Sequence, residues 1–172
     1  MSAELQPKKL INRFLIVGIA LLLIGIIWAG LRVISPDTPT LFAGSRPTNL
    51  GVESGQLAPC PNTPNCVSSQ SEDGTHSIAP LSYDAPATAV LGDIERLIQS
   101  INSAKIVAKT ENYLYAEFTS ALMGYVDDVE FYVNEDDNVI EVRSASRLGE
   151  SDLGVNRKRI EAIRQKLNEL YG

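Results

Sequence analysis

The sequence is poor in the side chains that enzymes most often use for acid–base, nucleophilic and metal chemistry. It contains one histidine, His76, and two cysteines, Cys60 and Cys66. Their spacing matches no usual zinc site, and a serine triad would need Ser68 or Ser69 without a nucleophile-elbow motif. No glycine-rich loop of the phosphate-cradling kind is present. These absences argue against an enzyme, and we expect no catalytic residue, no metal and no cofactor.

Basic residues are in the minority after the first 34 positions. Of 15 basic and 21 acidic side chains, four basic and one acidic lie in residues 1–34, so the remainder carries a net charge of −9. An acidic surface repels nucleic-acid phosphates and anionic lipid headgroups. We therefore expect no nucleic-acid partner, and a possible protein partner that is neutral or cationic.

One long apolar run, from Phe14 to Leu31, contains no charged residue. As a helix it would cover roughly 27 Å, close to the thickness of the hydrocarbon core of a bilayer. We expect a transmembrane anchor over residues 14–34, with the lipid bilayer as its partner. A cleaved signal peptide is the alternative, although its apolar stretch is normally shorter and ends at a small-residue cleavage site.

Positive charge is unequal on the two sides of this run. Lys8, Lys9 and Arg13 precede it, whereas only Arg32 follows closely. The positive-inside rule then places residues 1–13 in the cytoplasm. We expect a single-pass membrane protein whose C-terminal part lies in the periplasm or the thylakoid lumen.

Both cysteines follow the membrane segment and would meet an oxidising compartment. A turn-rich stretch with two prolines separates Cys60 from Cys66, so the two thiols can approach each other. A structural disulfide is the favoured interpretation, since the spacing is not that of a Cys-x-x-Cys redox pair.

The region before these cysteines, residues 35–59, is rich in Ser, Pro, Thr and Gly and shows no hydrophobic period. Such composition predicts a flexible linker. Residues 60–172 are long enough for one domain with one hydrophobic core.

Two stretches of this domain have the apolar spacing of amphipathic helices. One begins after Asp84 and Pro86 and has apolar residues from Val90 to Ile101. The other covers residues 154–171, with Asp152 or Ser151 as its cap. Its expected buried stripe is Ile160, Ile163, Leu167 and Leu170.

Between these helices, apolar and polar residues alternate with period two in four segments, around Ile106, Leu114, Val129 and Ile140. This pattern predicts four half-buried strands of an antiparallel meander. A short edge strand is expected over residues 78–83. The predicted fold is therefore α+β: a two-layer sandwich with an antiparallel four- to five-stranded sheet and two helices on one face, preceded by one N-terminal transmembrane helix.

Several longer motifs occur in a distinctive order: CP and PNCVSS at residues 60–69, YVDDVEF at 125–131, VRSASRLG at 142–149 and DLGVNRKRIE at 152–161. Together they resemble the uncharacterised family named domain of unknown function 1499, over residues 58–170. The resemblance implies a bacterial or plastid protein, often tethered or exported, and brings no established reaction. The family's motif residues correspond here to Cys60, Cys66, Asp127, Asp128, Glu130, Arg143, Ser144, Ser146, Arg147, Asp152, Asn156 and Arg157.

Alternation places a mixed polar set on the sheet face away from the helices. The candidate binding residues on this face are Tyr113, Tyr115, Asp128, Glu130, Arg143 and Arg147. Cross-strand ion pairs between them could be merely solvated, or the tyrosines and arginines could form a binding face. A third possibility is that the Cys60–Ser69 loop covers them.

Three further polar residues fall on the buried side: Ser144, Ser146 and Asn156. They are expected to satisfy one another's hydrogen bonds, or to line a small polar pocket. Arg157 or Arg159, at the start of the last helix, is expected to pair with an acid one turn away, or the basic group there with an anionic ligand.

The resulting prediction is a membrane-anchored, extracytoplasmic, non-catalytic binding or scaffold module. The alternative is a carrier that holds a small apolar or amphipathic ligand between sheet and helices.

Overall fold

The computed structural model describes residues 7–35, 40–83 and 85–171. The chain divides into two compact units, Met1–Thr38 and Pro39–Gly172, which are described separately. The helix-starting role expected for Asp84 lies outside the described residues.

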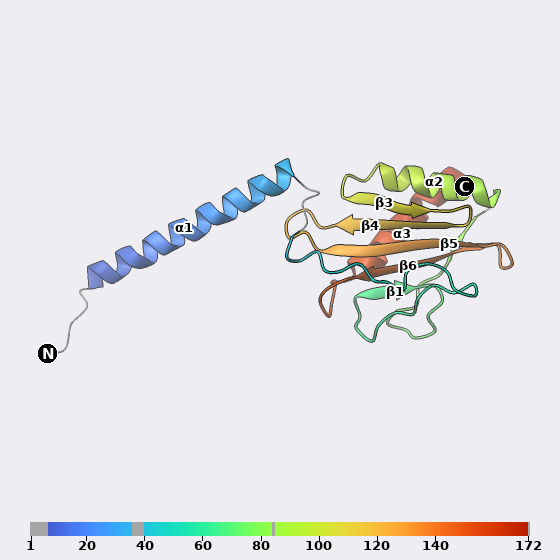
Figure 1. The fold of residues 1–172 in the computed structure, drawn as a ribbon, viewed down its shortest axis with the longest axis horizontal. Coiled ribbons are helices and arrows are strands. Elements are labelled where there is room, and N and C mark those ends of the chain that lie inside the picture. The colour runs from blue at the N-terminus through green and yellow to red at the C-terminus, as the bar shows by residue number, and fades with distance from the viewer. Residues whose placement is uncertain (1–6, 36–39, 84, 172) are drawn as a thin grey trace. The chain divides into compact units, whose positions relative to one another are not determined.

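The first unit is a single helix, α1 (Pro7–Ile34; Figure 1). Its stretch Ile11–Ile34 is long and apolar enough to cross a membrane. The expected apolar helix is therefore present as a candidate membrane span. It begins earlier than residue 14, at Pro7, because proline fits the first turn of a helix, where its missing N–H is not needed.

The second unit is the predicted two-layer α+β sandwich (Figure 1). Its antiparallel sheet has the order β1-β6-β5-β4-β3, and β2 pairs with the same edge of β6 as β1, nearer the start of that strand. The strands are β1 (Cys66–Ser68), β2 (Leu81–Ser82), β3 (Ala104–Lys109), β4 (Tyr113–Thr119), β5 (Val126–Asn134) and β6 (Val139–Ser146).

The four strands of the meander, β3 to β6, are the four predicted from alternation. β2 is the expected edge strand, shortened to two residues. β1 was not anticipated, because its three residues are all buried and show no alternation. It lies beside β6 with Cys66 opposite Ala145, which raises the sheet to six strands.

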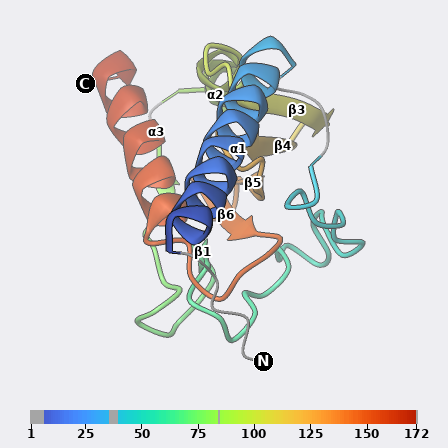
Figure 2. The same ribbon diagram turned by 90° about the vertical axis from the view of Figure 1, so that its left-hand side faces the viewer.

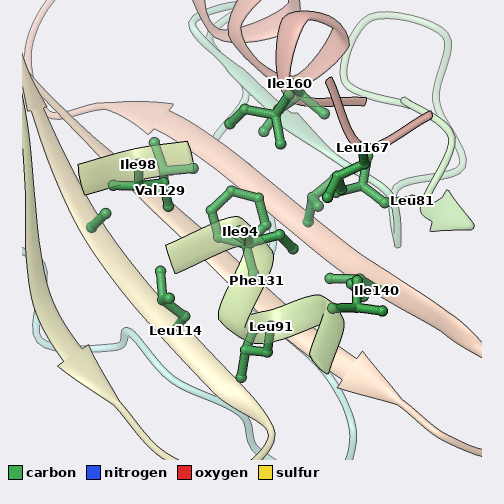
Figure 3. Close-up of a cluster of buried hydrophobic side chains, with 14 of the residues drawn as sticks. Leu81, Leu91, Ile94, Ile98, Leu114, Val129, Phe131, Ile140, Ile160 and Leu167 are labelled. Carbon is green, nitrogen blue, oxygen red and sulfur yellow. The ribbon is translucent and has the colours of Figure 1, made fainter. Parts of the chain in front are cut away.

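Two helices, α2 (Ala87–Gln99) and α3 (Val155–Tyr171), pack on one face of the sheet. Figure 2 shows them on the same side of the strands. Figure 3 shows the core between the layers, where Phe131 of β5 lies between residues of both helices. Ile94 and Ile160 are fully buried, as their helical spacing predicts.

The expected buried stripe of α3 is wrong at its last position. Leu170 is 58% exposed, whereas Leu167 is 2% exposed. The buried role passes to the first turn instead, where Asn156 is fully buried. α3 thus contacts the sheet through a polar residue in its first turn, and its last turn does not pack against the sheet.

Candidate functional site

The sheet face turned away from the helices, here called the polar face, carries the candidate binding residues. It is nearly closed to solvent: the exposed fraction is 0% for Glu130, 1% for Asp128, 4% for Tyr115 and 5% for Arg143. Of the possibilities that the sequence left open, a merely solvated face is therefore wrong.

Residues 40–57, here called the covering segment, lie over this face. Figure 1 shows the segment running along the sheet past β5 and β6. Near its middle, the Gly51 N–H donates to Glu130 Oε1 at 2.8 Å. Nearer its start, Arg46 Nε donates to Glu117 Oε1 at 2.8 Å. The Cys60–Ser69 loop is therefore not the main cover, contrary to the third sequence-based possibility.

This arrangement also differs from the flexible linker expected over residues 35–59. Thr40 Oγ1 donates to the Met123 carbonyl at 3.0 Å. The Leu57 N–H donates to Gln70 Oε1 at 2.7 Å, and Leu57 itself is buried. A composition rich in Ser, Pro and Gly predicts an irregular chain but does not reveal that distant side chains fix it.

The first ionic cluster of the polar face centres on Arg147, just after β6. Its guanidinium binds both oxygens of Asp128, with Nε–Oδ2 at 2.9 Å and Nη2–Oδ1 at 2.7 Å, and also contacts Glu117. The Tyr115 hydroxyl donates to Asp128 Oδ1 at 2.6 Å and accepts from Arg147. With Arg46, the cluster holds two positive and two negative charges.

Burial and hydrogen bonds shift the acidities in this cluster. Burial, and then the hydrogen bond to Asp128, raises the pKa of Tyr115 well above its usual value, so its hydroxyl stays protonated. Burial alone would raise the pKa of Glu117, but hydrogen bonds from Arg147 and Arg46 outweigh it and lower that pKa. Burial would likewise lower the pKa of Arg147, but its hydrogen bonds to Asp128 and Glu117 raise that pKa. Glu117 and Arg147 therefore stay charged at neutral pH.

The second cluster pairs Glu130 with Arg143, directly opposite it in the β5–β6 register. Arg143 Nη1 donates to Glu130 Oε2 at 3.2 Å, and the Tyr113 hydroxyl donates to Glu130 Oε1 at 2.8 Å. Burial, and then the Glu130 charge, raises the pKa of Tyr113. Arg143 Nε is buried with no hydrogen-bond partner among the described residues. Both cross-strand pairings expected from the sequence are thus present, but as buried ion pairs rather than solvated ones.

On the helix side, Asn156 is the centre of the polar cluster predicted there. Ser144 Oγ donates to Asn156 Oδ1 at 2.6 Å, and Asn156 Nδ2 donates to Ser146 Oγ at 3.0 Å. Nδ2 also reaches the Asn65 carbonyl at 2.9 Å. Asp152 accepts from the Asn156 N–H at 2.7 Å, which confirms its predicted capping role. The mutual satisfaction expected of these residues is confirmed.

The arginines at the start of α3 are placed differently from the expectation. Arg157 donates to the Ser77 and Thr75 carbonyls, at 2.8 and 3.0 Å, rather than to a carboxylate one turn away. Arg159 instead forms the ion pair, with Asp127 of β5 at 2.5 Å. Sequence reasoning missed this pair, although an acid on the apolar side of β5 indicates a basic partner on the facing helix.

The disulfide between Cys60 and Cys66 is present. The loop that it closes is tied to a neighbouring turn by His76, whose Nε2 lies 3.1 Å from the Thr63 carbonyl and whose Nδ1 lies 2.9 Å from Asp73. The side-chain hydrogen bond with Asp73 raises the pKa of His76, and burial opposes it. His76 is therefore a structural residue that links this turn to the disulfide loop.

The family model described as "Protein of unknown function (DUF1499)" matches residues 56–167. The chain belongs to the DUF1499 family. No curated protein and no solved structure matches it. The match contains the disulfide-bonded Cys66 and both ionic clusters apart from Arg46, but most of the covering segment precedes it. In this DUF1499 chain, the polar face is thus closed largely by residues outside the matched region.

Above the polar face, the covering segment forms a shallow hollow of ≈ 390 Å³. It lies near the Glu130–Arg143 pair, because Gly51 both lines the hollow and binds Glu130. Its lining is polar and rich in backbone: Asn49, Gly51, Glu53, Ser54, Gln56, Leu57, Ala58 and Pro59. Such a surface offers hydrogen bonds to a ligand but presents no nucleophile held beside a base.

The structure brings Tyr113, Tyr115, Asp128, Glu130, Arg143 and Arg147 together in one buried layer and places Asn156 and Arg157 on the opposite side of the sheet. Within the described part of the chain, no group of three His, Cys, Asp or Glu side chains is arranged to hold a metal ion. The hollow was not anticipated, because no periodic pattern marks the residues that form it.

Proposed function

We propose that this DUF1499 chain is a membrane-anchored, extracytoplasmic, non-catalytic binding module for a protein partner. α1 serves as the anchor. The excess of Lys8, Lys9 and Arg13 over Arg32 supports a cytoplasmic N-terminus. The disulfide supports an oxidising compartment for the domain, such as the periplasm or the thylakoid lumen.

The observation that carries the proposal is the closure of the polar face. Its carboxylates bind guanidinium groups or hydroxyls, and its tyrosines donate hydrogen bonds to those carboxylates. The pKa values of Tyr113 and Tyr115 are raised, further away from neutrality. General acid–base catalysis favours a group that titrates near the working pH and reaches a substrate. The paired groups of this face are instead suited to hold the covering segment in a fixed shape.

The surface that this fixed shape presents is the hollow of residues 49–59. The only charged side chain in its lining is Glu53, and the rest of the domain is strongly acidic. A neutral or cationic protein segment fits this chemistry better than an anionic one. Backbone groups around Gly51 and Ala58 would supply directional hydrogen bonds.

Site-specific photo-crosslinking in native membranes tests the proposal. The full chain should carry p-benzoylphenylalanine in place of Gln56 in the hollow or, as a control, in place of exposed Lys166 on α3. We expect a discrete, heavier adduct from the Gln56 position that is absent from the Lys166 position. No adduct from Gln56, or the same adducts from both positions, would contradict a binding role for the hollow.

Charge reversal tests the charge of the partner with the same adduct. Glu53→Lys should reduce the Gln56 adduct about tenfold if the partner is cationic, since like charges across an interface oppose association. Glu161→Lys, which makes the same change on an exposed face of α3, should leave the adduct unchanged.

The carrier hypothesis has no comparable support. The space between sheet and helices is filled by core side chains such as Phe131 and Ile94, which are fully buried (Figure 3). Ser144 and Asn156, whose polarity motivated that hypothesis, bind each other.

A further inference from the structure

One end of the domain exposes an unusual number of large apolar side chains; we call it the apolar end. The β4–β5 turn, the start of the covering segment and the loop after β6 meet there, because Thr119 pairs with Val126 and Asp127 pairs with Ser146. The exposed apolar residues of this end are Leu41, Leu122, Met123, Tyr125, Leu148, Leu153 and Val155.

These side chains come from three segments that contact one another. The rings of Phe42 and Tyr125 are 5.3 Å apart between centroids. A Cβ added to Gly44 would lie 3.0 Å from Leu148 Cγ, so the covering segment also touches the loop after β6. The apolar end is therefore one surface shared by several elements rather than a set of isolated side chains.

Two leucines on this surface are exposed to an extent that folding alone does not require. Leu41 is 94% exposed and Leu153 is 85% exposed. Leu153 also has φ of 55°, a left-handed conformation that is uncommon for a leucine. Contiguous exposed apolar surface of this kind usually marks a contact with a membrane or another protein.

Chain length favours the membrane of these two occupants. Thr40, fixed to the β4–β5 turn, is six residues from Ile34, the last residue of α1. Six residues reach at most about 20 Å in any conformation. A domain of this size is roughly 35 Å across, so Thr40 cannot stay within reach of the membrane surface if the apolar end points away from it.

We propose that the apolar end lies in the interfacial layer of the same bilayer that holds α1, so that the domain is attached to the membrane at two points. Apolar side chains enter the boundary between headgroups and acyl chains, and aromatic residues such as those of the Phe42–Tyr125 pair favour this layer. Glu150 and Asp152 lie in the loop that carries Leu153 and would repel anionic headgroups. The contact is therefore a hydrophobic one that suits zwitterionic lipid. The inference rests on the anchor of the proposed function but not on its hollow.

Bromolipid quenching of tryptophan fluorescence tests the contact in the full chain, reconstituted into phosphatidylcholine nanodiscs. In a Trp28→Phe background, Leu41→Trp or Leu153→Trp supplies a probe on the apolar end. We expect about a twofold loss of emission in brominated discs, since an interfacial side chain lies about 5–10 Å into the headgroup–acyl boundary. Leu170→Trp is the matched control, an exposed leucine in the last turn of α3, at the opposite end of that helix from Val155, and should not be quenched.

The possible results of this experiment distinguish a membrane contact from a protein contact. Emission that shifts to the blue without quenching by bromine would assign the apolar end to a protein surface or a second copy of the chain, and would overturn the inference. Unquenched emission that remains accessible to aqueous acrylamide would overturn it as well. Native Trp28, measured in the unsubstituted chain, reports separately whether α1 is inserted, so failure of the anchor is distinguishable from failure of the second contact.

Discussion

At the scale of single residues, buried polar side chains determine how the parts of this domain are joined. Asn156 contacts two serines of β6 and the carbonyl of Asn65 at the start of β1. One side chain therefore holds the last helix, the last strand and the disulfide loop together. An apolar residue of the same size could fill this space but would leave those polar groups without partners.

We predict that Asn156→Ala lowers the free energy of unfolding by about 2–3 kcal/mol, because it leaves several buried polar groups unpaired. Asn168→Ala, on the exposed side of the same helix, should change it by less than about 0.5 kcal/mol. Chemical denaturation followed by circular dichroism measures both values. Equal effects of the two substitutions would show that the cluster contributes no stability of its own.

The second residue-scale prediction concerns His76, the single histidine. Both ring nitrogens face acceptors, Asp73 and the Thr63 carbonyl, so only the protonated ring can donate to both. Its folded pKa is raised above the ordinary 6.5. The stabilisation from the charged ring is therefore full below pH 6.5 and is lost as the pH rises through the folded pKa.

Nuclear magnetic resonance of the His76 ring should accordingly give a pKa above 6.5, and denaturation should show stability falling as the pH rises through that value. Asp73→Asn should bring the pKa back towards 6.5 and flatten this part of the stability profile. A folded-state pKa at or below 6.5 would contradict the double-acceptor arrangement.

At the scale of elements, the covering segment has no regular secondary structure and depends on contacts from the sheet. Gly51 is its central attachment, with φ of 113°, a conformation that side-chain-bearing residues rarely adopt. Its N–H is the donor to buried Glu130. Loss of this attachment would expose the second ionic cluster to water.

We predict that Gly51→Ala destabilises the segment by about 1–3 kcal/mol through backbone strain and raises amide exchange in residues 45–57. Gly74→Ala is the matched control, since open space surrounds Gly74 and its φ is not positive. Hydrogen exchange followed by mass spectrometry distinguishes the two variants. Unchanged protection of the segment in Gly51→Ala would show that other contacts suffice to hold it.

The sequence predicts helices and strands that have a regular hydrophobic repeat far better than segments that have none. α2, α3 and the strands β3 to β6 follow from residue spacing, because burial on one side imposes a repeat of 3.6 or 2. The Glu130–Arg143 pair follows from the register of those strands. β1 and the covering segment do not, because they are short or irregular and are fixed by residues far away in the chain, such as Glu117 for Arg46. Their placement depends on tertiary contacts, and the burial of the polar face depends on the same contacts.

At the scale of the whole molecule, topology and redox state are linked through the cysteines. Cys66 is fully buried, whereas Cys60 is partly exposed. In a Cys66→Ser variant, we predict that an impermeant thiol reagent labels Cys60 in intact cells, or in right-side-out membranes. In a cysteine-free background, Lys8→Cys should stay protected until the membrane is lysed. The reverse pattern would place the domain on the cytoplasmic side.

If α1 anchors the chain as proposed, the outer strand β3 affects how neighbouring copies behave in a crowded membrane. Anchored copies are confined to a plane and collide more often than free ones, and an unpaired strand at the border of a sheet is a template for fusing neighbours into aggregates. β3 is such a strand, but it carries Lys105 and Lys109 and its register shifts between Ile106 and Ala108. Positive charge and a break in the ladder discourage edge-to-edge joining. Under the proposed anchoring, crowded copies would therefore stay separate molecules.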